Sequence, residues 1–101
     1  MLWSFWKNML TLDMPIHIPE DITFSIVGQD AFLLNTQTNK YYALEEVGTR
    51  LWELLKDGKQ LKESYQILLD EYEVESAQLE LDVLELVGDL MENGLVEFFQ
   101  A

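Results

Sequence analysis

Residues 33–58 have the sequence LLNTQTNKYYALEEVGTRLWELLKDG, in which the spacing of apolar side chains changes from every second position to every third or fourth. Before this change, residues 40–44 form a short run of aromatic and aliphatic side chains that follows a polar turn at 37–39. Such a run is typical of a strand after a hairpin turn. After the change, apolar residues recur at helical spacing until Asp57 and Gly58, which form a common helix stop. The segment therefore predicts a strand followed directly by an amphipathic helix.

The flanking sequence extends this segment into an α+β domain. Residues 22–27 alternate in a strand period, and turn residues separate them from a second run at 31–36, so the three strands form an antiparallel meander. Helical spacing returns twice toward the C-terminus, where Ser76 is expected to be an N-cap. The expected elements are strands at 22–27, 31–36 and 40–44, helices at 45–57, 61–72 and 77–93, and a short strand at 95–99 that returns to the sheet.

The predicted fold class is therefore α+β and winged helix-turn-helix-like. An N-terminal three-stranded antiparallel sheet is followed by three helices and a short C-terminal strand. The chain of 101 residues is long enough for one hydrophobic core and too short for two. We expect a compact domain over residues 21–101, preceded by an N-terminal extension, residues 1–20, that is partly loose.

The composition fits a reducing compartment. Without cysteine it has no disulfide and no thiolate ligand or nucleophile. No apolar run approaches the ~20 residues that span a bilayer, and the N-terminus lacks the features of a signal peptide. We expect a soluble, cytoplasmic protein.

The charge balance argues against nucleic acid and anionic membranes as partners. Six basic residues stand against 19 acidic ones, a net charge of −13, whereas such partners are bound through Lys and Arg. Residues 1–44 contain four acidic and two basic residues, and residues 45–101 contain fifteen and four. The polar face of the last helix presents Asp82, Glu85, Asp89 and Glu92, expected to be solvated. A DNA-recognition helix needs hydrogen-bond donors there, so a winged-helix regulator is disfavoured.

No motif in the sequence supports catalysis. His17, with Glu20 three residues on, is expected to be a surface or strand-edge histidine. No serine lies in a nucleophile elbow, no glycine-rich loop could hold a phosphate, and the carboxylate spacing matches no calcium loop. We expect no enzyme, no cofactor and no metal site.

The strand at 40–44 is the best candidate for a binding surface. Sheet edges are usually protected from pairing with another chain by lysine, proline or a bulge, and in this strand only Lys40 can give that protection. An unprotected edge can accept an extended peptide as an added strand. If the helix at 77–93 packs alongside, its apolar side would form the floor of a groove between helix and strand.

The order of these segments resembles the coenzyme PQQ synthesis protein D family, also called the RiPP recognition element. The resemblance covers about residues 22–96. It rests on LLNTQTNKYYALEEVGTRLWELLKDG, LKESYQILLDEYEV and LDVLELVGDLMENGLV, with the Gly48-xxx-Trp52-xx-Leu55 helix among the specific parts. The tyrosine pair and the short chain are most similar to the stand-alone leader-binding proteins of lasso-peptide clusters.

The resemblance implies a non-catalytic protein that captures the leader of a ribosomally made precursor between the third strand and the third helix. The same resemblance implies that it would deliver the precursor to a leader peptidase of the transglutaminase-like cysteine protease type and to an ATP-dependent macrolactam synthetase. By position, the peptide-binding residues would be Lys40, Tyr41, Tyr42, Ala43 and Leu44 on the strand and Leu79, Asp82, Val83, Glu85 and Leu86 at the helix. Carboxylates beside the groove, Asp89 included, would favour a leader with a nearby Lys or Arg.

Two alternatives stay open from the sequence. An acidic interaction module or nucleic-acid mimic would use Asp82 and Glu85 to occupy a basic partner. Self-association would place Trp3, Phe5 and Trp6 of one chain in the groove of another, so we expect a monomer or a weak homodimer. Phe5 and Trp6 also belong to an amphipathic stripe at helical spacing near the N-terminus, formed by Leu2, Phe5, Trp6, Met9 and Leu10.

Overall fold

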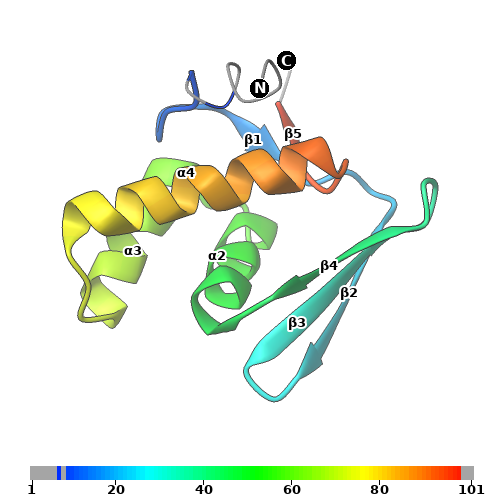
Figure 1. Ribbon diagram of the computed structural model, residues 1–101, viewed down its shortest axis with the longest axis horizontal. Helices are drawn as coiled ribbons and strands as arrows, with labels where there is room; N and C mark the ends of the chain where they lie inside the picture. Colours follow the sequence, from blue (N-terminus) through cyan, green and yellow to red (C-terminus); the bar gives the residue numbers. More distant parts are fainter. Residues whose placement is uncertain (1–6, 8, 99–101) are drawn as a thin grey trace.

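The computed structural model describes Lys7 and residues 9–98. In chain order the elements are β1 (Ile16–His17), β2 (Ile22–Val27), β3 (Asp30–Asn35), β4 (Lys40–Leu44), α2 (Glu46–Lys56), α3 (Leu61–Glu71), α4 (Ser76–Glu92) and β5 (Glu97–Phe98). The predicted fold class, with its three-stranded antiparallel sheet, three helices and short C-terminal strand, is confirmed. In Figure 1, α2 is seen nearly end-on between α4 and the sheet.

The sheet has the order β2-β3-β4, and both of its neighbouring pairs are antiparallel. A two-residue turn joins β2 to β3, and Gly28 within it has a φ of 67°. Asn39 takes a φ of 60° in the turn before β4, a conformation that asparagine tolerates better than most residues. These short turns bring consecutive strands together as a meander.

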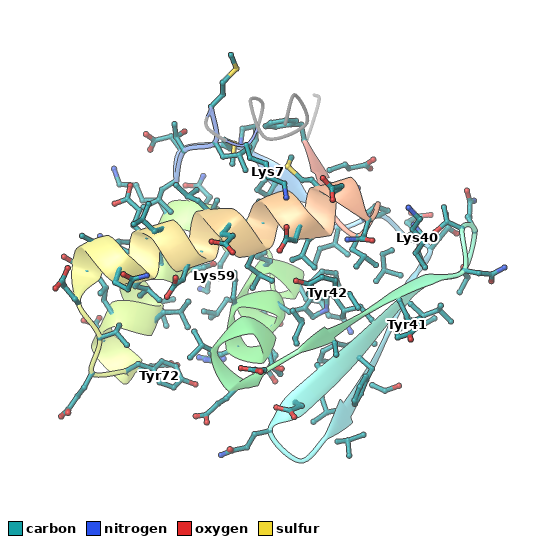
Figure 2. The ribbon with its side chains drawn as sticks, in the orientation of Figure 1. Lys7, Lys40, Tyr41, Tyr42, Lys59 and Tyr72 are labelled. Carbon is teal, nitrogen blue, oxygen red and sulfur yellow. The ribbon has the colours of Figure 1, made fainter. Side chains whose placement is uncertain are left out.

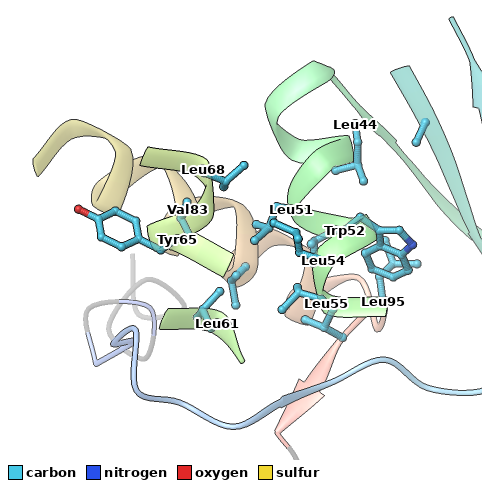
Figure 3. Packing of buried hydrophobic residues seen from close by; sticks show 14 of the residues in the cluster. Leu44, Leu51, Trp52, Leu54, Leu55, Leu61, Tyr65, Leu68, Val83 and Leu95 are labelled. Atoms are coloured by element: carbon cyan, nitrogen blue, oxygen red, sulfur yellow. The ribbon is translucent and has the colours of Figure 1, made fainter. Parts of the chain in front are cut away.

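The hydrophobic core forms where α2 packs between the sheet and the other two helices (Figure 3). Trp52 is 1% exposed and stacks on Phe24 of β2, with ring centroids 6.5 Å apart. The Trp52 indole N–H has no hydrogen-bond acceptor within the described part of the chain. Other fully buried members are Leu33, Leu51, Leu61, Leu68, Val87, Leu90 and Leu95.

The three helices begin and end close to the expected positions. Gly58, with a φ of 91°, follows the C-cap of α2. The N-cap of α4 is Glu75, without a side-chain hydrogen bond, so the prediction that Ser76 caps this helix was wrong by one residue. Ser76 instead accepts a hydrogen bond at its carbonyl from the Tyr65 hydroxyl, at 2.8 Å, which ties α3 to the start of α4.

The C-terminal strand does not return to the main sheet. β5 pairs with β1 in a separate two-stranded sheet, so that part of the prediction was wrong. The physical reason lies in the preceding turn: Gly94 has a φ of 71°, and Leu95 and Val96 after it are buried in the core. The chain then reaches the surface beside the N-terminal segment (Figure 1).

Part of the N-terminal segment packs on the domain. Leu10 is buried and Met9 is exposed, whereas Leu2, Phe5 and Trp6 of the expected stripe lie outside the described residues. Trp3, which the self-association alternative also uses, lies outside them too. The boundary at residue 20 stays a prediction. None of the helices described is long and apolar enough to cross a membrane, and no cluster of metal-ligating side chains occurs in residues 9–98 or at Lys7.

Candidate functional site

Strand β4 has one free edge. The two-residue turn makes Val27 and Asp30 a hydrogen-bonded pair, and such pairs alternate along antiparallel strands. Alternate residues of β3, beginning at Ala31, therefore bond to β4 rather than to β2. Their partners on β4 are residues 40, 42 and 44, so the backbone groups of Tyr41 and Ala43 point away from the sheet. No other strand in the described structure pairs with this edge.

The side chains of β4 alternate between two surfaces. Leu44 is buried and Tyr42 is half-buried, both on the side that faces the helices. Tyr41 is 75% exposed on the opposite face, where Phe32 and Leu34 of β3 are also exposed. The edge strand therefore separates a surface that leads to the core from an exposed, apolar surface.

The surface on the helix side opens into a cavity of about 420 Å³ between the end of β4, the start of α2 and Leu86 of α4. Gly48 allows these three elements to approach one another. An ideal Cβ at this position would lie 3.2 Å from Leu86 Cδ2 and 3.3 Å from Leu44 Cδ2. Because residue 48 has no side chain, Leu86 can remain in the wall of the cavity.

A smaller apolar cavity of about 190 Å³ lies next to the first and extends between the three helices. The two cavities share the lining residues Val47, Gly48 and Leu86. Leu79 and Val83 form part of the deeper wall, and both are buried. Together the cavities form a groove, named here the β4–α4 groove, that runs from the free strand edge toward the core.

Two contacts join the sheet to the C-terminal end of α4, next to the Tyr42 end of the first cavity, which is called the closed end of the groove below. The Asn35 side-chain amide donates to the Gly94 carbonyl at 2.9 Å, while its Oδ1 accepts from two backbone N–H groups of the following turn. The Tyr42 hydroxyl donates a long hydrogen bond, 3.4 Å, to Asp89 Oδ2. Strand and helix are therefore connected at this end.

The electrostatics of the closed end depend on Asp89. Burial raises the pKa of the Tyr42 phenol, and the negative charge of Asp89 raises it further. Lys7 Nζ lies 2.7 Å from Asp89 Oδ1, and this hydrogen bond raises the pKa of the lysine. Asp89 is therefore not a free carboxylate on a solvated face, as its helical position predicted, because Lys7 and Tyr42 contact its two oxygens. That it favours a basic leader stays a prediction. Asp82 and Glu85 are exposed.

The structure brings together most of the residues expected in the site. The first cavity includes Tyr42, Ala43, Leu44 and Leu86, and the second includes Leu79, Asp82, Val83 and Leu86. Lys40, Tyr41 and Glu85 line neither cavity, although Glu85 is near enough to Tyr42 to raise its pKa. The lining residues of the two cavities show which side of α4 faces the groove, a question that the sequence left open.

Sequence reasoning missed two contributions. The first is the first turn of α2, which forms the floor of the groove. The only sign of this role in the sequence was Gly48, because a glycine inside a helix costs about 1 kcal/mol relative to alanine and therefore needs a structural reason. The second is Lys7, whose partner on α4 is 82 residues away in the chain. No local pattern identifies such a pair.

A free strand edge beside an apolar groove defines a class of domain that can accept an extended segment as an added strand. Residues 30–96 match the family model of coenzyme PQQ synthesis protein D (PqqD), and the chain belongs to this family. A comparison with curated proteins finds no match.

Two solved structures have the same fold. The structure of TbiB1 in complex with the TbiA(beta) leader peptide is 28% identical, with a TM-score of 0.77, and the match covers 84% of this chain and 99% of that one. A lasso peptide synthetase B1 complexed with the leader peptide is also 28% identical, with a TM-score of 0.72, and the match covers 81% and 96% of the two chains.

Proposed function

We propose that this protein is a non-catalytic leader-peptide binding protein. Its ligand is the leader of a ribosomally made precursor peptide, which adds as a strand to the free edge of β4. The observation that carries the proposal is this edge, at which Tyr41 and Ala43 present backbone donors and acceptors directly beside the β4–α4 groove. Both solved structures named above contain a leader peptide, which supports the same function.

The geometry of β4 suggests how the leader is recognised. The backbone of Tyr41 and Ala43 supplies hydrogen bonds that do not depend on sequence. Because side chains alternate along a strand, every second leader residue faces the groove, toward Leu44 and Leu86. The intervening residues lie beside the exposed Tyr41 ring. We expect an apolar or aromatic residue on each face of the bound strand.

Binding of the leader would increase the effective concentration of the core peptide at the maturation enzymes. The proposed recipients are a leader peptidase of the transglutaminase-like cysteine protease type and a macrolactam synthetase. Precursor peptides are made on ribosomes, so the proposed location is the cytoplasm. We expect the binding protein to act without a cofactor.

Calorimetric titration of the full chain tests the proposal, using the leader segment of the precursor encoded beside its gene. Leu86→Ala and Tyr41→Ala remove one side chain from each face of the site. Leu86 is a better choice than Val83, which is buried in the core and would lose stability on replacement. Lys59→Ala, on the exposed turn after α2, is the control.

We expect saturable binding by the wild type and by Lys59→Ala, and at least about fivefold weaker binding by Leu86→Ala, since a lost apolar contact costs ~1–3 kcal/mol. Thermal unfolding confirms that each variant is folded. If the wild type binds no leader, the proposal is wrong. Equal affinity in all four proteins would place the binding site elsewhere.

A further inference from the structure

Lys7 anchors the N-terminal segment to α4 at the closed end of the groove. Its Nζ lies 2.7 Å from Asp89 and 3.7 Å from Glu92, and its side chain is only 15% exposed. The aliphatic part of the side chain lies over Gly88, where an ideal Cβ would be 3.2 Å from Lys7 Cγ and Cδ. Leu10 packs on the same glycine, also at 3.2 Å from that Cβ position.

The absence of a side chain at position 88 therefore allows both residues to lie directly on the helix. Lys7 and Leu10, which form this contact, are called the N-terminal clasp below. The ion pair is partly buried, so solvent screens it less than a pair on the open surface.

The clasp contacts the same carboxylate that the edge strand uses. Asp89 Oδ1 accepts from Lys7, and Asp89 Oδ2 accepts from the Tyr42 hydroxyl. Figure 2 shows Lys7 and Tyr42 on opposite sides of α4, near its C-terminal end. One carboxylate therefore connects three segments: the N-terminal segment, α4 and β4.

We propose that Lys7 is a positioning residue for the β4–α4 groove. By holding Asp89 in place, it keeps an acceptor in front of Tyr42 and so sets the spacing between the edge strand and the helix. The Lys7 bond is short and charge-assisted, whereas the Tyr42 bond is long, so the lysine determines where the carboxylate lies. Without Lys7, the carboxylate can turn toward solvent and Tyr42 loses its acceptor.

This inference rests on the proposed function, because the groove matters only if it binds a peptide. The test is calorimetric titration of the full chain with the same leader segment, comparing Lys7→Met with the conservative Lys7→Arg. Lys62→Met is a matched control, since it removes the same charge from an exposed lysine that pairs with Asp13, outside the groove. Thermal unfolding checks that each variant is folded.

We expect Lys7→Met to weaken leader binding about fivefold, the size of effect seen when a residue acts through a contact network. Lys7→Arg should restore most of the affinity, and Lys62→Met should bind like the wild type. Tyr42→Phe should weaken binding as well, and adding it to Lys7→Met should cause little further loss because both act through Asp89. Wild-type affinity in Lys7→Met, or full additivity of the two changes, would overturn the proposal.

A second measurement uses the free protein and does not depend on leader binding. The Tyr42 ring resonances, assigned with Tyr42→Phe, should shift in Lys7→Met and return in Lys7→Arg. If the wild type binds no leader, the proposed function and the groove-positioning role both fail, even if these resonances respond. If the wild type binds and the resonances do not respond to Lys7, only the positioning role is wrong. Asp89→Asn provides a second variant if Lys7→Met does not fold.

Discussion

Gly48 and Leu86 lie in such close contact that no side chain fits between them without moving one of the two. An ideal Cβ on Gly48 would be 3.2 Å from Leu86 Cδ2, closer than an ordinary van der Waals contact. Gly48 is in α2 and Leu86 is in α4, and both line the two cavities of the groove. The shape of the proposed peptide site therefore depends on a missing side chain as much as on those present.

Gly48→Ala should separate stability from binding. Alanine favours a helix by ~1 kcal/mol over glycine, which offsets the crowding at Leu86 and Leu44 and leaves the free energy of unfolding nearly unchanged. The Leu86 methyl group must give way by a few tenths of an ångström, and because Leu86 lines the groove we expect this change of shape to weaken leader binding by about twofold to fivefold. Urea unfolding and calorimetric titration measure the two effects.

Leu86→Ala supplies the control for this prediction. In the double variant the new methyl group has room, so the effect of Gly48→Ala on affinity should shrink. An undiminished effect in the double variant, or wild-type affinity in Gly48→Ala alone, would contradict the assignment of Leu86 to the groove wall.

Ala43→Pro should abolish leader binding and leave the sheet intact. The Ala43 N–H points to the free edge, so proline removes a donor for the leader without removing a hydrogen bond to β3. Ala43→Thr, which keeps the N–H and adds a larger side chain on the exposed face, is the control. We expect native circular dichroism in both variants and leader binding only in Ala43→Thr. If Ala43→Pro unfolds the domain and Ala43→Thr does not, the derived direction of this N–H is wrong.

Asp82→Asn combined with Glu85→Gln should slow association with a leader that contains Lys or Arg. These carboxylates are exposed on α4, on the side of the groove, and attract a basic peptide before contact. Stopped-flow association at low salt should show a reduction of about twofold to fivefold, which disappears near 1 M salt, where the screening length falls to ~3 Å. A reduction that persists at high salt would indicate direct contact rather than long-range attraction.

Glu71→Gln should weaken the contact between α2 and α3 in a pH-dependent way. Arg50 donates two hydrogen bonds of 2.8 Å to the Glu71 carboxylate, which lowers its pKa below the ordinary value of 4.5. A lowered pKa in the folded state adds stability above pH 4.5, and this is lost as the pH falls through the lowered value. Both side chains are more than a third exposed, so solvent screening limits the effect at pH 7 to roughly 0.5 kcal/mol.

Urea unfolding at pH 7 and pH 3 measures this difference. Asp70→Asn is a control on the same helix. It also removes one negative charge from a chain of net charge −13, so it accounts for the general relief of repulsion that any such change brings. We expect Glu71→Gln to be the less stable variant at pH 7 and the two to converge at pH 3. Equal stability at pH 7 would mean that the ion pair contributes nothing measurable.

The sequence predicted the elements well because the signals for them are local. Alternation over 22–27 and helical spacing after Glu45 each depend on residues a few positions apart. Gly58 and Gly94 marked the ends of two helices for the same reason, since both adopt a positive φ. The partner of the final strand was wrong because pairing depends on which distant segment lies beside it.

The candidate site was predicted in outline and not in its details. The edge strand and the apolar side of α4 followed from their side-chain patterns. The alternation that leaves only Tyr41 and Ala43 with free backbone groups follows from the register of the first hairpin, which the sequence did not establish. Asp89 had the pattern of a solvated residue because helical spacing shows only which face is polar, not what covers it.

The amino-acid sequence by itself determined the fold class, the family and the absence of cysteine chemistry, because these follow from residue types and their spacing. Tertiary structure alone decided how the groove is closed. Asp89 joins Lys7 and Tyr42, which are 82 and 47 residues away along the chain. A contact over such separations arises only when the core has brought α4 between the N-terminal segment and β4, so its geometry is a property of the packed chain and not of any one segment.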